Sequence, residues 1–241
     1  MTLSMPIFDP HARIDTLTLD DGQRVHVVDD ALAEPERLRA WVLDHADAFE
    51  PVGFSQYPGR YIMAPAIVQE DMRRYFLKQM RPLFDARRLL RLHARFSIAT
   101  QLPEQLRPPQ WLCHRDHFGL DARQSIQASV LYLFEDDALG GTGFYAPARP
   151  AREMSALFND AIRMSGDAFG QRYGLSPGYI TESNRYFQRT GGVSARWNRM
   201  VFYDGQALHS SDIAEPGRLN DDPQHGRLTL NGFFTSTRHA R

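Results

Sequence analysis

Cysteine is nearly absent from this 241-residue chain, because Cys113 is its only representative. A single thiol excludes an internal disulfide framework and favours folding in a reducing compartment. Long apolar runs are also missing. None approaches the length that crosses a bilayer, and no signal segment of basic and then apolar residues opens the chain. We therefore expect a cytoplasmic protein without a membrane partner.

A surplus of charge of one sign is lacking as well. The 28 basic and 29 acidic residues give a formal net charge of −1, which argues against nucleic acid as a partner. Lysine itself is almost missing, and we interpret Lys78, the only one, as evidence of a compositional bias of the genome rather than of a need for guanidinium groups. The 42% hydrophobic and 24% charged residues are typical of a globular protein, and the length fits a single domain spanning residues 1–241.

The N-terminal region, residues 1–90, has a pattern that predicts a hairpin and two supporting helices. The turn signal Asp21-Gly22 lies between two alternating apolar segments, as in a β-hairpin. Apolar residues at helical spacing then predict one helix from about Pro35 and another from about Ala66. We expect Pro82 to end or kink the second helix.

From residue 91 onward the apolar period changes to two, which predicts a β-rich core over residues 91–241. A stripe of apolar residues between Met154 and Phe169 predicts one long helix inserted in this region, and residues 170–198 are expected to form a long loop. This order of elements favours an α+β fold, a β-sandwich or jelly roll braced by helices. The predicted strands cover residues 91–98, 125–134, 140–145, 200–203 and 227–234.

Three side chains far apart in the sequence form a candidate metal site. If His114 and Asp116 lie on a strand, residues two apart share a face and point the same way. A third ligand must then come from a remote strand, and His209, just after a predicted strand and turn, is well placed to supply it. Two imidazoles and one carboxylate suit Fe(II) and leave coordination positions free for substrates.

The last predicted strand carries the second clue. Arg227, Thr229 and Asn231 share one face, whereas the apolar Leu228 and Leu230 share the other. If the polar face lines a cavity, Arg227 is a buried cation that needs an anion. A carboxylate of a 2-oxo acid would meet that need through paired, charged hydrogen bonds, with the Thr229 hydroxyl as a further donor.

Each of these residues also has an ordinary structural interpretation when it is taken alone. A single His-x-Asp, a single histidine or a single arginine is more often a core or surface residue than a ligand. We assign His93 and His225 to that ordinary class, and likewise His117, although His117 lies close enough in sequence to contact a ligand. Cys113 is expected to be a small buried hydrophobic residue.

Taken in order, these fragments resemble the 2-oxoglutarate/Fe(II)-dependent dioxygenase superfamily, closest to its prolyl-hydroxylase-like branch. The resemblance covers residues 91–234, and its parts are specific as an ordered set rather than singly. The matching fragments are 109–116 (Pro-Gln-Trp-Leu-Cys-His-Arg-Asp), 130–133 (Val-Leu-Tyr-Leu), 140–145 (Gly-Gly-Thr-Gly-Phe-Tyr), 208–211 (Leu-His-Ser-Ser) and 227–231 (Arg-Leu-Thr-Leu-Asn).

The resemblance implies a double-stranded β-helix, a jelly-roll and cupin-like fold, with inserts at about 146–198 and 212–226 that could close over the metal. It implies an oxygenase that uses Fe(II), 2-oxoglutarate and O2. His114, Asp116 and His209 would be the iron ligands, and Arg227 with Thr229 would hold the C5 carboxylate of 2-oxoglutarate. Tyr132 matches a strand tyrosine that often contacts this co-substrate.

Hydroxylation of a C–H bond is the expected outcome, because halogenating relatives lack the carboxylate that Asp116 supplies here. A small molecule, an amino acid or a peptide side chain all remain candidate substrates. The residues expected to line the substrate site are Trp111, Arg95, Asn231, Tyr179, Tyr186 and Phe187.

Three other functions remain open. One is a cupin-like metalloenzyme that uses no 2-oxo acid, although the Arg227-x-Thr229 pair argues against it. A second is a noncatalytic jelly-roll protein that binds a metal or ligand. The third is a zinc hydrolase with the same three side chains. The sequence shows no obvious general base beside the three ligands, so we rank the hydrolase last.

Overall fold

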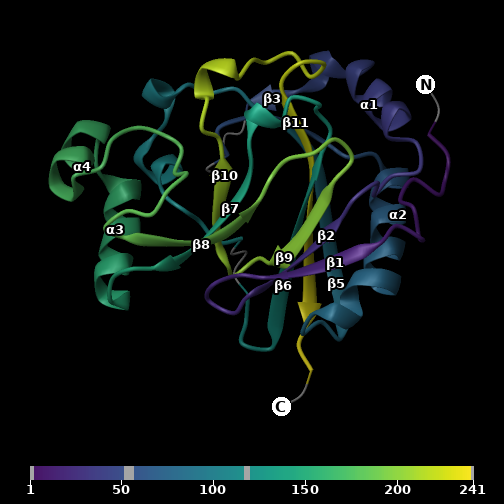
Figure 1. Cartoon of the computed structure of the whole chain (residues 1–241), viewed down its shortest axis with the longest axis horizontal. Coiled ribbons are helices and arrows are strands. Elements are labelled where there is room, and N and C mark those ends of the chain that lie inside the picture. The colour runs from purple at the N-terminus through teal and green to yellow at the C-terminus, as the bar shows by residue number, and fades with distance from the viewer. Residues whose placement is uncertain (1–2, 52–56, 117–119, 240–241) are drawn as a thin grey trace.

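Two antiparallel β-sheets stack against each other, with a pair of helices outside each of them (Figure 1). The computed structural model describes residues 3–51, 57–116 and 120–239. The larger sheet has eight strands in the order β1-β2-β9-β6-β11-β5-β4-β3, and the smaller has three in the order β10-β7-β8. The strands of the larger sheet are β1 (Ile14–Thr18), β2 (Arg24–Val28), β3 (Glu50–Pro51), β4 (Gly59–Met63), β5 (Arg88–Ala99), β6 (Gln124–Tyr132), β9 (Met200–Asp204) and β11 (Arg227–Thr237). Those of the smaller sheet are β7 (Gly141–Pro147), β8 (Phe187–Val193) and β10 (Leu208–Asp212).

The outer face of the larger sheet packs on helices α1 (Pro35–Leu43) and α2 (Ala66–Tyr75). Proline in the first turn starts α1 as the sequence predicts, and α2 passes through a π-helical turn before the short helix that contains Pro82 ends it. Phe76 and Phe234 stack with ring centroids 4.1 Å apart at the centre of this layer. The predicted hairpin is confirmed by the pairing of β1 with β2, and the two predicted helices are confirmed as α1 and α2.

The inner face of the larger sheet meets the smaller sheet. Tyr132, Val201 and Tyr203 from the larger sheet pack with Phe144 from β7 and Val193 from β8 in one buried cluster. Alternation along β11 separates the two layers, because Leu228, Leu230 and Phe234 belong to the outer cluster. The residues between them in sequence therefore face the space between the sheets.

Two expectations for the inserted region are wrong. The predicted single helix is divided into α3 (Ala151–Arg163) and α4 (Gly166–Tyr173), because Met164 is extended and the Ser165 hydroxyl accepts a hydrogen bond from the Ala168 amide as an N-cap. The predicted loop at 170–198 contains strand β8, which pairs with β7 through a register shift beside Phe144. Its glycines and exposed polar residues hide the alternation of a strand at a sheet edge.

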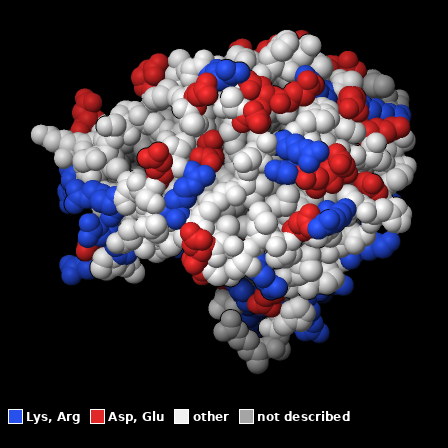
Figure 2. Space-filling model, in the orientation of Figure 1, with Lys and Arg blue, Asp and Glu red and all other residues white. Residues whose placement is uncertain are grey.

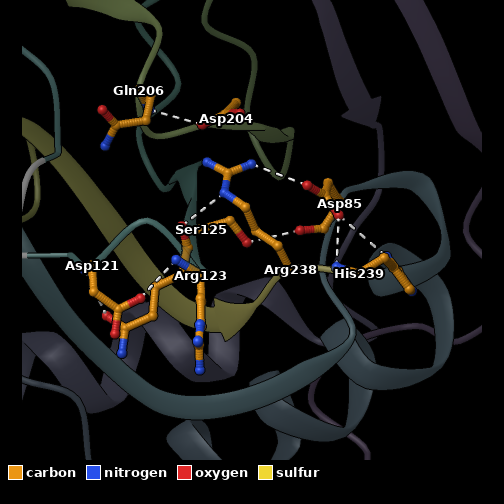
Figure 3. Close-up of polar contacts among 9 residues, drawn as sticks. Asp85, Asp121, Arg123, Ser125, Asp204, Gln206, Arg238 and His239 are labelled. Atoms are coloured by element: carbon orange, nitrogen blue, oxygen red, sulfur yellow. Dashed lines mark hydrogen bonds and ion pairs between the residues drawn. The ribbon is translucent and has the colours of Figure 1, made fainter. Parts of the chain in front are cut away.

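A polar cluster fastens the end of β11 to the start of β6 (Figure 3). Asp85 accepts hydrogen bonds from an Arg238 guanidinium nitrogen at 3.1 Å and from the His239 amide at 3.0 Å, and its backbone carbonyl accepts from the Ser125 hydroxyl at 2.8 Å. Such exposed pairs each contribute about 0–1 kcal/mol. Together they anchor the strand that carries Arg227.

The face of the molecule shown in Figure 2 is not dominated by charge of one sign. Acidic and basic side chains lie side by side across the face shown in Figure 2, in line with the net charge of −1. Within the described ranges, none of the helices combines the length and the hydrophobicity that crossing a bilayer requires.

Candidate active site

A cavity of about 980 Å³ opens between the two sheets. Its floor comes from the inner face of β5, β6 and β11, and its walls come from β10, the segment before residue 116 and helix α3. The cavity is large enough for more than one small molecule, since ligand pockets commonly enclose ~300–1,000 Å³. The three predicted metal ligands and Arg227 all line it.

Backbone pairing brings two of these ligands together. The His114 amide donates to the His209 carbonyl at 3.0 Å, and the His209 amide returns a bond of 3.0 Å to the His114 carbonyl. This isolated antiparallel bridge joins the segment before residue 116 to β10. Asp116 is held next to them by its amide, which donates to the Gly205 carbonyl at 2.7 Å. A Cβ at Gly205 would lie 3.1 Å from that of Asp116, so glycine permits the close approach.

The side chains of His114, Asp116 and His209 point into one small volume. One nitrogen or oxygen from each lies within 4.8 Å of those of the other two. The Nδ1 atom of His209 lies 3.0 Å from the Ala207 carbonyl and donates to it, so Nε2 is left unprotonated and directed at the site. Nε2 is 3.5 Å from Oδ2 of Asp116, and the Tyr203 ring packs against the imidazole with centroids 4.7 Å apart.

Burial shifts all three groups toward their neutral forms. Desolvation lowers the pKa of His209 to about 4. His114 opens to the cavity on one side, yet the protein atoms around it, together with the neighbouring His209, lower its pKa to about 4 as well. Desolvation raises the pKa of Asp116 to about 6, against the opposing effect of His114 and Arg95.

These three side chains fit a divalent metal ion. Oδ2 of Asp116 is buried and has no hydrogen-bond partner among the described residues, which is costly unless a cation or another donor occupies the space beside it. Neutral imidazoles with free ring nitrogens and an anionic oxygen form the mixed ligand set of non-heme Fe(II) sites. The hydrogen bond from His209 to Ala207 fixes the imidazole in the orientation that such a site needs.

Arg227 lies at the deep end of the cavity and is only 2% exposed. Its Nε donates to the Gly140 carbonyl at 3.1 Å and its Nη2 to the Gly141 carbonyl at 2.8 Å. Both acceptors are neutral, so two donors have partners but these contacts do not balance the positive charge. Among the described residues no carboxylate forms an ion pair with it. Thr229 donates weakly to the Ser97 carbonyl at 3.3 Å and accepts from the Asn231 amide at 3.0 Å.

Arg95, on the adjacent strand β5, also lines the cavity. It is the cross-strand partner of Asn231, and its guanidinium lies over the rings of Phe233, Tyr61 and Tyr57 at 5.3, 5.7 and 6.0 Å. Its buried Nε has no hydrogen-bond partner among the described residues. Burial lowers its pKa, although an arginine stays protonated at neutral pH.

The remaining predicted site residues divide into two groups. Tyr179, like Arg95 and Asn231, lines the cavity. Trp111, Tyr186 and Phe187 are buried instead in the core under α3 and α4, where the Trp111 indole donates to the Leu106 carbonyl at 3.0 Å. Large aromatic residues are common in cores, and sequence spacing alone does not show on which side of the smaller sheet they lie.

Tyr132 is fully buried and does not line the cavity itself. Its hydroxyl shares a 2.7 Å hydrogen bond with that of Thr142, which does line it. His117 lies outside the described residues.

Several cavity residues were not predicted from the sequence. Phe233 continues the alternation of Arg227, Thr229 and Asn231 and could have been found by extending it by one step. Tyr57 comes from a loop before β4, and no local signal places it here. Phe158 and Ile162 of α3 lie on the cavity side of the inserted helix.

The two inserts differ in their relation to the cavity. Residues 146–198 contribute Phe158, Ile162 and Tyr179 to its lining. Residues 212–226 contribute none of the described lining, and this segment is packed down by buried Leu219 and by an ion pair from Arg218 to Asp136.

Solved structures that resemble the chain are distant. A prolyl-4-hydroxylase from Pseudomonas putida is 14% identical, with 90% of this chain and 93% of that chain covered and a TM-score of 0.47. HygX from Streptomyces hygroscopicus, solved with nickel and 2-oxoglutarate bound, is 13% identical over 91% of this chain and 83% of its own, with a TM-score of 0.47. SnoK, a non-heme alpha ketoglutarate dependent carbocyclase from nogalamycin biosynthesis, is 13% identical over 89% of this chain and 80% of its own, also with a TM-score of 0.47.

These solved structures are what the chain is similar to in fold, and they include proteins of the class that the sequence resembles. No curated protein matches the chain. One family profile does match, and it spans residues 10–234. Because that match covers nearly the whole sequence, the chain belongs to DUF6445, a family of unknown function.

Proposed function

We propose that the chain is a non-heme Fe(II), 2-oxoglutarate-dependent oxygenase that hydroxylates an unactivated C–H bond of a small molecule, an amino acid or a peptide side chain. One observation carries the proposal: a cavity that holds a His-Asp-His set also holds a buried arginine without a carboxylate partner among the described residues. A metal site alone has many uses. The neighbouring cation adds a requirement for an anionic co-substrate.

The order of the strands supports a double-stranded β-helix as the fold. From β5 onward the chain crosses from the larger sheet to the His114 bridge on β10, and back to β6. It then runs through β7 and β8 of the smaller sheet, returns to β9, crosses to β10 and ends on β11. Repeated crossing between two facing sheets is the path of a jelly roll, which closes around a central cavity. A single domain over residues 1–241 is consistent with this path.

His114, Asp116 and His209 would hold the iron, and Arg227 with Thr229 would hold the distal carboxylate of 2-oxoglutarate. When bound, Fe(II), the 2-oxo acid and O2 supply the oxidising chemistry, with succinate and CO2 as the products of the co-substrate. The protein itself would hold the metal ligands and the co-substrate in position. The Ala207 carbonyl fixes the His209 ring, the two glycine carbonyls aim the Arg227 guanidinium, and the surrounding aromatic rings exclude water.

Tyr132 would act on the co-substrate through Thr142 rather than by direct contact. Its buried hydroxyl orients that of Thr142 through their 2.7 Å hydrogen bond. The Thr142 side chain then presents a fixed donor or acceptor at the cavity wall.

An anaerobic titration tests the proposal. Fe(II) and 2-oxoglutarate added together should give a visible metal-to-ligand charge-transfer band, and admission of O2 should release succinate. Asp116→Ala should lose both signals, whereas Asp15→Ala, an equal change at an exposed position on β1, should keep both. Absence of the band in the unaltered protein contradicts the proposal, and undiminished turnover by Asp116→Ala excludes Asp116 as a ligand.

The same measurements separate the other functions. A noncatalytic binding protein would show the band without succinate. A cupin-like enzyme that needs no 2-oxo acid would bind iron without any band on addition of 2-oxoglutarate. A zinc hydrolase would give neither the band nor succinate, and it would need a general base beside the metal.

A further inference from the structure

Besides Arg227, two arginines among the described residues line the cavity, and the co-substrate accounts for neither of them. Arg115 is exposed to solvent and donates to the Gln206 carbonyl at 2.7 Å, whereas Arg95 lies on the inner face of the sheet. Asp116 is the carboxylate that most affects its pKa, and we have assigned Asp116 to the metal. The segments 52–56 and 117–119, which adjoin the site in sequence, contain no aspartate or glutamate that could supply another. Arg95 is half-buried, and its Nε is buried without a partner among the described residues. Removing a guanidinium from water without an anion is unfavourable, so this position is suited to a charged group that arrives with a ligand.

Charge balance leads to the same conclusion. With the proposed contents of the site, the charges of Fe(II), the Asp116 carboxylate, the 2-oxoglutarate dianion and the Arg227 guanidinium cancel. Of the two arginines left over, Arg115 is exposed and solvated, so Arg95 is the uncompensated charge at the inner face of the sheet.

Arg95 and Arg227 belong to separate parts of the cavity. Asn231, the cross-strand partner of Arg95, lies four residues from Arg227 along β11, which is about 13 Å in an extended strand. Tyr57 lies between them. Its ring faces the Arg95 guanidinium at 6.0 Å, and its hydroxyl lies near Thr229 and Arg227, whose influence partly offsets the burial that raises its pKa. One small dianion held by Arg227 therefore leaves Arg95 free for a different molecule.

The surroundings of Arg95 resemble a binding site rather than a packing contact. The aromatic faces of Tyr61 and Phe233 hold the guanidinium by cation–π attraction, which orients it without using its N–H donors. Asn231, which is paired with Arg95 on the next strand, donates one side-chain amide hydrogen to Thr229 and has a second one left. The planar donor edge of Arg95 is thus available for bidentate recognition of a carboxylate or a phosphate.

We propose that Arg95 binds an anionic group of the primary substrate, so that the substrate is an organic acid or a phosphate ester held by Arg95 with an apolar part against Phe233 and Tyr61. The role of this molecule as a substrate, and the charge balance, rest on the proposed oxygenase function; the contacts of Arg95 with Phe233 and Tyr61 do not.

Calorimetry with the whole protein tests the site. Ni(II) replaces Fe(II) to prevent turnover, 2-oxoglutarate is kept saturating, and the probes are phenylacetate, phenyl phosphate and the neutral phenylacetamide. At least one anionic probe should bind saturably, and phenylacetamide should bind about tenfold or more weakly. The tighter of the two anions identifies carboxylate or phosphate as the natural group. Equal binding of the neutral amide, or no binding of either anion, overturns the proposal.

Variants then assign the binding to Arg95. Arg95→Gln should weaken the anionic probe about 10- to 100-fold, and Arg95→Lys, which keeps the charge but loses the fork, should have an intermediate effect. Arg91→Gln, an equal change at an exposed position on the same strand, should have none. The unfolding midpoint of each variant, measured beside its affinity, shows that the fold is retained.

Two further results are decisive. If Arg95→Gln weakens 2-oxoglutarate and leaves the anionic probe unchanged, Arg95 holds the co-substrate and the inference is wrong. If the protein binds neither Ni(II) nor 2-oxoglutarate, the oxygenase proposal fails. The same probe titration on the metal-free Asp116→Asn variant still tests the anion site, because this change removes the carboxylate that could otherwise balance the charge of Arg95.

Discussion

His114 and His209 exchange both of their backbone hydrogen bonds, each with a donor–acceptor distance of 3.0 Å. The two imidazoles are therefore fixed relative to each other by main chain, and their ring centroids lie 4.3 Å apart. Such pairing makes the site largely preformed, so little chain ordering opposes metal binding. It also links a segment without regular structure to β10.

Metal binding should consequently stabilise the fold. At a free Mn(II) or Ni(II) concentration about 100 times the dissociation constant, binding adds about 2.7 kcal/mol to the free energy of unfolding. For a chain of this length each kcal/mol raises the melting temperature by about 2–4 °C. Differential scanning calorimetry with metal and with EDTA measures the shift. His209→Ala should abolish it, whereas His225→Ala, at an exposed position paired with Asp222, should retain it. An equal shift in both variants would place the metal elsewhere.

Metal affinity should fall at acid pH because of Asp116. Its pKa of about 6 in the metal-free protein means that protons compete with the metal for this carboxylate below pH ~6. His114 and His209, with pKa values lowered to about 4, should add to the competition only near that pH. The apparent dissociation constant for Ni(II) should rise about tenfold per pH unit between pH ~6 and ~4. Asp116→Asn should bind more weakly, with little pH dependence in that range. A midpoint near 6.5 that persists in this variant would mean that the histidines titrate normally.

The same groups have opposite effects on the stability of the metal-free fold. The pKa of Asp116 is raised from 3.8, so its contribution is fully present below pH ~3.8 and is lost as the pH rises through about 6. The pKa of His209 is lowered from 6.5, so its contribution is present above 6.5 and is lost as the pH falls toward about 4. The free energy of unfolding is measured by urea titration in EDTA between pH 4 and 7. The loss of stability that Asp116 causes as the pH rises through about 6 should be present in the unaltered protein and absent in Asp116→Asn.

The parts of the site that could be predicted from the sequence depend on local geometry. Period-two alternation on β11 separates Arg227, Thr229 and Asn231 from the apolar face, and the strand geometry enforces that separation wherever the sheet lies. His114 and Asp116 were grouped on the assumption of a strand, whereas the structure has only an isolated bridge at His114 and holds Asp116 by its amide bond to the Gly205 carbonyl. The position of His209 beside the other two ligands depends on the fold. It could be predicted because a set of one carboxylate and two imidazoles is a typical metal-ligand set.

The residues that could not be predicted depend on packing between distant segments. Tyr57 reaches the cavity because β4 pairs with β5, and the loop before β4 has no pattern that shows this. Trp111 was expected at the substrate site, but α3 and α4 form a core that encloses it. The division of the inserted helix did have a signal, because Ser165 is a preferred N-cap residue and Asp167 places an acidic side chain in the first turn. The apolar stripe that continues across Ser165 obscured the break.

Replacement of Arg227 should affect both co-substrate binding and stability. Arg227→Gln removes a charged donor, so the KM for 2-oxoglutarate should rise about 10- to 100-fold with a smaller change in kcat. The Gly140 and Gly141 carbonyls also lose their donors, which should cost about 1–3 kcal/mol in the free energy of unfolding. Succinate assays and urea titration measure the two effects. Arg218→Gln, which removes an exposed arginine, is the control. A normal KM in Arg227→Gln would leave the co-substrate carboxylate to another residue.

Packing in the outer layer should determine the stability of the fold without changing its affinity for the metal. Phe76 is fully buried and stacks on Phe234 across the face of β11 opposite the cavity. Phe76→Ala leaves a cavity in this layer and should lower the free energy of unfolding by about 3–5 kcal/mol, whereas Leu90→Ala, at a half-exposed position on β5, should change it by less than about 1 kcal/mol. Because the sheet separates the two faces, Ni(II) affinity without denaturant should stay within about twofold in both variants. Loss of metal affinity in proportion to stability would mean that the site is formed by the outer packing as well as by the backbone pairing of His114 with His209.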